Sequence, residues 1–144
     1  MRAAVIGVGN LLLGDEGVGI HAARRLASMS LPPNVDVIDG GTGGLNLLPH
    51  IEGRDLVVFI DCADVGGAPG TVYRISLEDL DDPNTEAKVL SMHEVGLKQV
   101  LALAKALFKR MPSVTVYGVQ PARVDWGTNL SPELAQILPE LVEL

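Results

Sequence analysis

Asp55-Leu56-Val57-Val58-Phe59-Ile60-Asp61 is the stretch of this 144-residue sequence that decides its fold class. Five apolar residues follow one another between two carboxylates, without the alternation of a strand that has one solvent-facing side. An uninterrupted apolar run of this length is typical of a strand buried on both faces, as in a parallel sheet that is covered by helices. Residues 55–61 are therefore predicted to form a central strand of an α/β protein.

The segments around this strand alternate between strand and helix patterns. Strands are expected at residues 3–7, 35–38, 71–75 and 114–119, and helices at 17–29, 45–51, 91–110 and from 131 onward. This alternation predicts a three-layer α/β/α sandwich with a mostly parallel, five-stranded twisted sheet. No helix precedes residues 71–75, so an antiparallel edge strand is expected there. Residues 77–88 are acidic and polar and are expected to form a surface loop. Residues 1–144 are expected to form a single domain.

The composition of the chain argues against several classes of protein. Apolar residues make up 47% of it, enough for a core without disulfides, and a single cysteine is present. The net charge is −7 with 11 scattered basic residues, which disfavours nucleic-acid binding. No apolar run approaches the roughly 18 residues of a membrane span, and the first residues enter a strand at once, unlike a signal peptide. We therefore expect a cytoplasmic protein that binds neither nucleic acid nor membrane.

Three carboxylates follow the carboxyl ends of three consecutive predicted strands. They are Glu16, Asp39 and Asp61. Open parallel sheets build their sites in the crevice outside these strand ends, so the three residues predict an acidic pocket. Each of them could instead cap a helix or a loop. Asp15 is a plausible capping residue, which leaves Glu16 freer to point elsewhere.

One histidine stands in a position suited to metal binding. Ser91-Met92-His93-Glu94 matches a helix capping box, which places His93 in the first turn of a helix. The helix dipole disfavours the protonated imidazole there and leaves a neutral ring that can bind a metal. Together with two carboxylates, this imidazole would suit a divalent transition metal, although a lone histidine is more often structural. His21 and His50 are expected to be surface residues.

The glycine-rich loops have distinct interpretations. Gly7-Val8-Gly9-Asn10 resembles half of a dinucleotide-binding motif, but Leu12 stands where the third glycine belongs, so a phosphate site is not expected. Asp39-Gly40-Gly41-Thr42-Gly43-Gly44 has more glycines than a plain turn needs and would suit a loop against which an extended peptide lies. Cys62 has no basic neighbour in the sequence and is expected to be a small core residue.

Several of these segments, taken in order, resemble the hydrogenase maturation endopeptidases. The matching segments are residues 7–19 (GVGNLLLGDEGVG), 39–42 (DGGT), 91–97 (SMHEVGL) and 118–121 (GVQP), with Asp61 closing the third strand. The resemblance implies an aspartic-type endopeptidase that removes a C-terminal extension from the large-subunit precursor of a [NiFe] hydrogenase. It also implies Glu16, Asp61 and His93 as ligands of nickel that the substrate carries, although another divalent metal could substitute. Asp39 with Gly40, Gly41 and Thr42 would lie near the scissile peptide.

The sequence leaves the chemistry open. Nickel could polarise the peptide carbonyl as a Lewis acid, or Asp39 or Glu16 could act as general base on a water molecule. The same ligands would also serve a nickel chaperone or a non-catalytic module that binds the precursor. A flavodoxin-like nucleotide-binding domain is disfavoured by the broken glycine pattern and by the acidic rim.

Overall fold

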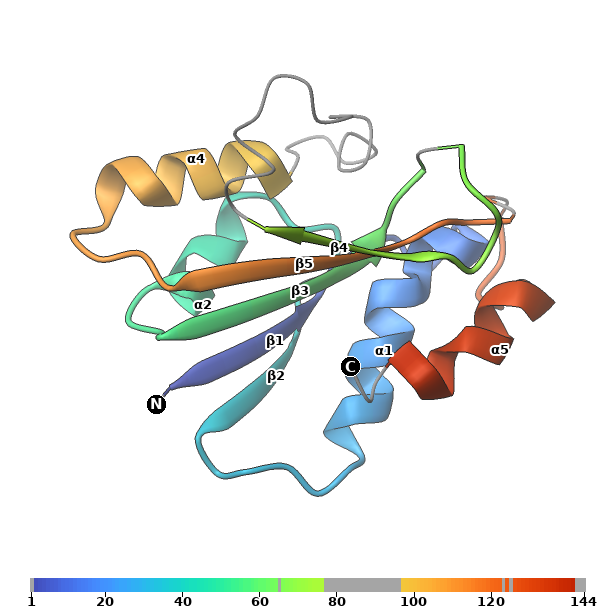
Figure 1. The fold of residues 1–144 in the computed structure, drawn as a ribbon, viewed down its shortest axis with the longest axis horizontal. Helices are drawn as coiled ribbons and strands as arrows, with labels where there is room; N and C mark the ends of the chain where they lie inside the picture. Colours follow the sequence, from blue (N-terminus) through green and yellow to red (C-terminus); the bar gives the residue numbers. More distant parts are fainter. Residues whose placement is uncertain (1, 65, 77–96, 123, 125, 142–144) are drawn as a thin grey trace.

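A computed structural model describes residues 2–64, 66–76, 97–122, 124 and 126–141 of the chain. Its five strands are β1 (Ala3–Gly7), β2 (Val35–Asp39), β3 (Leu56–Cys62), β4 (Val72–Ser76) and β5 (Ser113–Val119). They form one sheet in the order β2-β1-β3-β5-β4, in which β4 is antiparallel to β5 and the other pairs are parallel (Figure 1). The predicted mostly parallel sheet with an antiparallel edge strand is confirmed.

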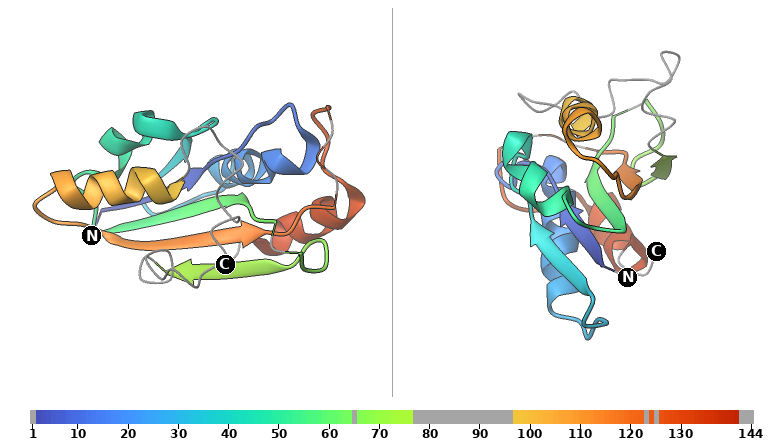
Figure 2. Two further views of the ribbon diagram at one scale, coloured as in Figure 1. Left: turned by 90° about the horizontal axis from the view of Figure 1, so that it is seen from above. Right: turned by 90° about the vertical axis from the view of Figure 1, so that its left-hand side faces the viewer.

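Helices cover both faces of this sheet. The α-helices are α1 (Val18–Ala27), α2 (Leu48–Ile51), α4 (Leu97–Leu107) and α5 (Pro132–Leu141), and the 3-10 turns are η1 (Gly14–Gly17) and η2 (Gly44–Leu47). Helices α2 and α4 lie on one face, and α1 and α5 lie on the other (Figures 1 and 2). The three-layer sandwich predicted from the sequence is therefore confirmed. None of the helices in the described part of the chain is long and apolar enough to cross a membrane.

Strand β3 supplies side chains to both halves of the core, as its apolar run predicts. Val57 and Phe59 are fully buried on the side of α2 and α4. Ile60 and Cys62 are buried on the side of α1 and α5. Because successive side chains of a strand point to opposite faces, Asp61 points to the same side as Phe59.

Helix α1 packs against the strand ends at unusually short range. A Cβ atom on Gly19 would lie 2.1 Å from the carbonyl oxygen of Ile60, and one on Gly7 would lie 2.1 Å from the carbonyl oxygen of Gly19. Only glycine allows the backbones to approach this closely. The start of α1, and the η1 turn before it, are thereby held at the carboxyl edge of the sheet.

Helix α1 is shorter than the sequence predicts. The expected helix spans 17–29, but α1 ends at Ala27, where the hydroxyl of Ser28 donates to the carbonyl oxygen of Arg25 at 2.7 Å. A local hydrogen bond of this kind competes with helix continuation. Met29, the last residue of the expected helix, therefore lies beyond α1 and is 43% exposed. The expected loop 77–88 and capping box 91–94 lie outside the described residues.

Candidate functional site

Glu16 reaches the carboxyl edge of the sheet through the loop that connects β1 to α1. The amide of Val8 donates to the carbonyl oxygen of Ile60 at 2.9 Å, so the loop leaves β1 beside the end of β3. The loop then winds into η1, which contacts β3 and contains Glu16. Only 3% of Glu16 is exposed. A buried carboxylate at this edge is what the sequence predicts for a site.

Asp61 lies near the end of β3 and is fully buried. Its Oδ1 accepts a hydrogen bond from the amide of Cys62 at 2.7 Å. Burial raises the pKa of the Cys62 thiol above its ordinary value, and the negative charges of Asp61 and Glu16 raise it further. The two carboxylates therefore act on one thiol from two elements. The prediction that Cys62 is a buried core residue is also confirmed.

Asp39 occupies a different environment at the same edge. It ends β2, pairs in register with Gly7, and has a 47% exposed side chain. Its Oδ1 accepts from the amide of Gly41 at 3.0 Å, and its Oδ2 lies 3.8 Å from Nε of Arg24. Strand β1 stands between Asp39 and Asp61, which separates their strands by about 10 Å. The site thus has a buried acidic part and an exposed one.

The glycine loop after Asp39 is bonded to the neighbouring strand end. The amide of Gly40 donates to the carbonyl oxygen of Gly7 at 2.8 Å, and the amide of Gly9 donates to the carbonyl oxygen of Gly41, also at 2.8 Å. Gly41 has a φ of +57°, a conformation that favours glycine. Thr42 is exposed at the tip. The loop therefore lies along the edge between Asp39 and the start of the Glu16 loop.

Asp15 has a role that the sequence analysis assigned wrongly. We expected a local capping residue, but Asp15 is fully buried and bonds to segments far along the chain. Its Oδ2 accepts from the amide of Ala122 at 2.8 Å and from the hydroxyl of Ser131 at 2.7 Å. Its Oδ1 accepts from the amide of Ser131 at 2.7 Å. Asp15 therefore fixes the turn that carries Glu16, and no local pattern links position 15 to position 131.

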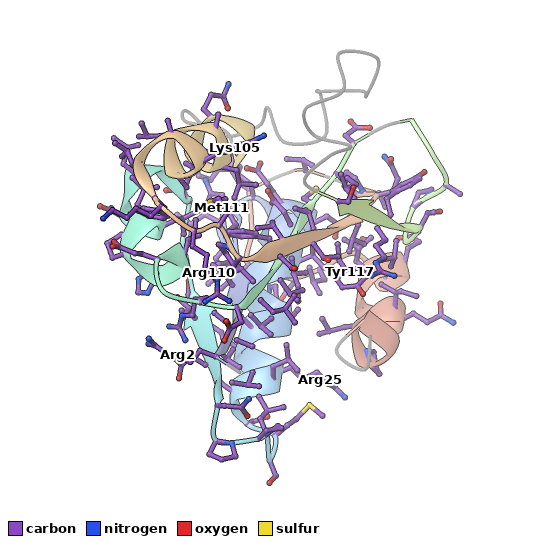
Figure 3. All side chains as sticks on the ribbon, turned by 60° about the vertical axis from the view of Figure 1, so that its left-hand side comes forward. Arg2, Arg25, Lys105, Arg110, Met111 and Tyr117 are labelled. Atoms are coloured by element: carbon purple, nitrogen blue, oxygen red, sulfur yellow. The ribbon has the colours of Figure 1, made fainter. Side chains whose placement is uncertain are left out.

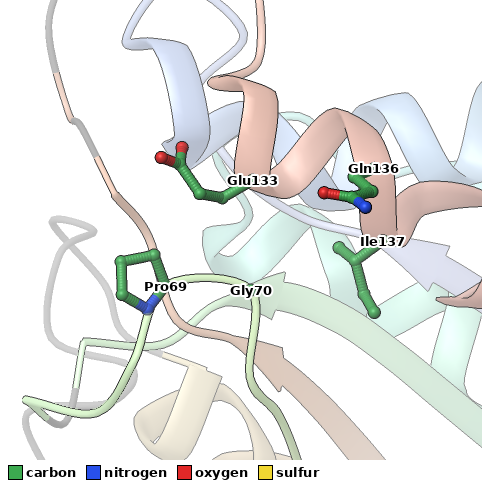
Figure 4. Close-up of a pocket in the computed structure, with 5 residues that line it drawn as sticks. All are labelled: Pro69, Gly70, Glu133, Gln136 and Ile137. Atoms are coloured by element: carbon green, nitrogen blue, oxygen red, sulfur yellow. The ribbon is translucent and has the colours of Figure 1, made fainter.

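A second polar network, also missed from the sequence, orders the loop after β3. Gln120 is 4% exposed and donates through Nε2 to Oδ1 of Asp64 at 3.0 Å. Its Oε1 accepts from the amide of Gly67 at 3.1 Å. Beside this loop, Pro69, Gly70, Glu133, Gln136 and Ile137 line a cavity of about 300 Å³ next to α5 (Figure 4). The network holds one wall of that cavity in place.

The histidines separate into three cases. His93, the expected third metal ligand, lies outside the described residues. His21 is only partly exposed: burial lowers its pKa, and its Nε2 lies 3.1 Å from the carbonyl oxygen of Thr128. His21 is thus a surface residue that a distant segment partly covers, and His50 is exposed as expected. Among the described residues, no group of three or more His, Cys, Asp or Glu side chains is arranged to hold a metal ion.

Solved structures similar to this one include hydrogenase maturation peptidases. The hydrogenase maturating endopeptidase HybD of Escherichia coli matches with a TM-score of 0.85 and 31% identity, over 99% of this chain and 88% of that chain. The hydrogenase 2 maturation peptidase of Thaumarchaeota archaeon SCGC_AB-539-E09 matches with a TM-score of 0.74 and 34% identity, over 99% of this chain and 94% of that one. The fold is that of these peptidases.

Sequence comparison gives the same result. Hydrogenase expression/formation protein HupD of Rhodobacter capsulatus is 38% identical over 137 residues, which are 93% of this chain and 64% of that protein. The hydrogenase 2 maturation protease of Escherichia coli is 32% identical over 145 residues, 99% of this chain and 87% of that protein. The chain thus spans 64% of the length of the HupD relative. The profile of the HycI hydrogenase maturation proteases matches residues 20–144, and the chain therefore belongs to the hydrogenase maturation protease family.

Proposed function

We propose that this protein is an endopeptidase that removes the C-terminal extension of a [NiFe] hydrogenase large-subunit precursor. The observation that carries the proposal is that two buried carboxylates, Glu16 in η1 and Asp61 in β3, lie on elements that contact each other at the carboxyl edge of the sheet. Membership of the maturation protease family supports the same activity. We place the reaction in the cytoplasm, where a newly made precursor would be processed.

Nickel enters this proposal as part of the substrate. Carboxylates and an imidazole suit a borderline divalent cation, so Glu16, Asp61 and His93 would hold nickel that the thiolates of the precursor already bind. When bound, the ion would polarise the neighbouring peptide carbonyl, and another divalent metal could take its place. Glu16 and Asp61 come from two elements in contact, η1 and β3, which fits two ligands of one ion. A precursor without nickel would lack this contact, so selectivity arises from differential binding.

The exposed part of the site would bind the peptide and hydrolyse its bond. Asp39 is open to solvent and begins the glycine loop, so it is suited to act as general base on the attacking water. The enzyme would then be an aspartic-type endopeptidase. The backbone of Gly40, Gly41 and Thr42 would lie along the extended substrate. Glu16 is the weaker candidate for the base because it is almost fully buried.

The test is processing of purified nickel-loaded precursor, followed as the mass lost from its C-terminus. Asp61→Asn, His93→Ala and Asp39→Asn are expected to lower the processing rate by roughly 100-fold or more, because each removes a ligand or the base. Glu52→Gln, an exposed carboxylate near the opposite end of the sheet, is the matched control and should process normally. Circular dichroism and thermal melting establish that each variant is folded.

A chaperone or binding module would give a different pattern. Such a protein would bind the nickel-loaded precursor and release it at its original mass. Complete absence of cleavage by the wild-type protein, with binding retained, would reject the endopeptidase in favour of this second function. Normal cleavage by folded Asp61→Asn and His93→Ala variants would instead show that these residues are not needed as nickel ligands.

A further inference from the structure

Trp126 is the single tryptophan of the chain and is 82% exposed. Leu12 is 55% exposed on the loop that leads to Glu16. One exposed apolar side chain is ordinary on a protein surface, but apolar side chains that gather in one place usually mark an interaction site. The position of these two residues relative to each other is therefore informative.

A parallel β-bridge brings the two residues together. The amide of Gly127 donates to the carbonyl oxygen of Leu12 at 2.8 Å, and the amide of Gly14 donates to the carbonyl oxygen of Gly127 at 2.9 Å. This bridge pairs Leu13 with Gly127. Leu12 and Trp126 stand one residue before the bridge on the two segments, so their backbones lie close together. Paired backbones lie about 4.8 Å apart, so these two exposed apolar residues belong to the same small area of the surface.

The segment that carries Trp126 is fastened on both sides. Asp15 accepts from the amide of Ala122 before it and from the amide of Ser131 after it. His21 lies 3.1 Å from the carbonyl oxygen of Thr128 within it. The segment and the Glu16 loop project together at the same end of the molecule (Figure 2, left view). The backbone next to Trp126 is therefore bonded at Gly127 and Thr128, which lowers the backbone entropy that binding would cost there.

The surface is continuous with the proposed active site. Leu12 and Glu16 belong to the same short loop, and η1 bonds back to it through the amide of Glu16 and the carbonyl oxygen of Leu13 at 3.2 Å. The net charge of the chain is −7, and the exposed carboxylate of Asp39 lies at the same edge. A polypeptide that offers an apolar side chain with a basic side chain near it would match both the surface and its charge.

We propose that Leu12 and Trp126 form a docking surface for the precursor polypeptide next to its cleavage site, and that they bind an apolar side chain of a segment that also carries basic charge. This proposal rests on the proposed function. Tryptophans in the middle of interfaces are among the side chains that contribute most to binding. The surface would hold the peptide while the carboxylates engage the nickel.

Fluorine NMR tests the contact directly. Because the chain contains one tryptophan, growth with fluorotryptophan gives one resonance, whatever tryptophans the unlabelled precursor contains. The probe is the purified nickel-loaded large-subunit precursor from the same organism as this protein. Saturating precursor is expected to shift the resonance and to protect it from a soluble paramagnetic quencher. A shift that depends on the concentration of this protein alone would mean that a second copy covers the surface, and would overturn the proposal.

Kinetics supply the second measurement. Trp126→Ala is expected to raise the KM for precursor by roughly ten-fold, and Leu12→Ala by several-fold, with kcat unchanged. Trp126→Phe should recover most of the loss. Leu107→Ala and Met29→Ala remove exposed apolar side chains, of 62% and 43% exposure, that lie outside this surface and should leave KM unchanged.

The outcomes separate this proposal from the proposed function. Normal processing by Trp126→Ala, or a resonance that does not move at saturating precursor, overturns the docking surface and leaves the endopeptidase standing. A precursor that shifts the resonance but is never cleaved supports the docking surface and rejects the endopeptidase. A precursor that is neither bound nor cleaved overturns both.

Discussion

At the scale of single residues, the carboxyl edge shows how the same functional group takes different roles in different surroundings. Asp61 and Glu16 are buried, and we propose them as ligands of the nickel that the substrate carries. Asp39 is open to water, which suits proton transfer. Asp15 is also fully buried, and it accepts hydrogen bonds from N–H and O–H donors far along the chain, which suits a structural anchor.

Asp15→Asn is expected to lower the free energy of unfolding by about 2–3 kcal/mol, because an amide NH₂ group must face donors that a carboxylate accepts. Ser131→Ala removes only the hydroxyl contact and should cost about 1 kcal/mol. Urea unfolding of both variants measures the difference. If both variants lose the same free energy of unfolding, the hydrogen bonds that Asp15 accepts from backbone amides contribute nothing to stability.

At the scale of elements, the decisive contact is that of α1 with the sheet. Gly19 stands where the helix meets the carbonyl oxygen of Ile60 and the backbone of Val8. The contact sets the height of α1 above the strand ends. It therefore also sets the position of η1 and of Glu16.

Gly19→Ala is expected to destabilise the protein by about 3 kcal/mol or more, because the new methyl group would overlap backbone atoms that cannot move away. Gly17→Ala places its Cβ 3.0 Å from the Cα of Leu11, a milder crowding, and should cost less. Thermal unfolding ranks the two variants. A Gly19→Ala protein as stable as the wild type would show that α1 can shift along the sheet.

The elements also show what the sequence could predict. Strand β3 was predictable because double-sided burial leaves an uninterrupted apolar run, and β4 because no helix precedes it. The end of α1 was not, because a single hydroxyl, that of Ser28, decides it. The hydrogen bonds of Asp15 and the partial burial of His21 were not predictable either, because their partners lie 107 to 116 residues away. Local patterns thus predict strand ends, and hence Asp39 and Asp61, better than contacts between loops.

At the scale of the whole molecule, ion pairs lie at the amino ends of the strands, away from the candidate site. Arg2 and Arg110 lie on one side of the molecule in Figure 3, where Asp55 accepts from the amide of Arg2 and from the guanidinium of Arg110. Arg54 lies at the same end, with an 11% exposed side chain bonded to Asp36. Paired cations thus gather at the amino ends of the strands, opposite the carboxylates of the candidate site. The pairing at the amino ends holds the sheet together without touching that site.

Arg54→Met is expected to cost about 2–3 kcal/mol of stability, because it leaves the carboxylate of Asp36 and the carbonyl oxygens of His50 and Ala3 without this donor. Arg110→Ala, at a 77% exposed side chain, should change stability by about 0.5 kcal/mol or less. Urea unfolding measures both. The kcat for precursor, measured below the melting temperature, should match the wild type in each case, and a lower kcat would show that the two ends are coupled.

The strand order has a consequence for the newly made chain on the ribosome. Strand β4 is synthesised before β5, yet β5 is its neighbour in the sheet, so β4 must wait about 40 residues of synthesis for its partner. Asp15 waits longer still, because Ser131 donates two of its hydrogen bonds. The turn that bears Glu16 therefore gains its last hydrogen bonds only after residue 131 has been made, so the candidate site is completed late in synthesis.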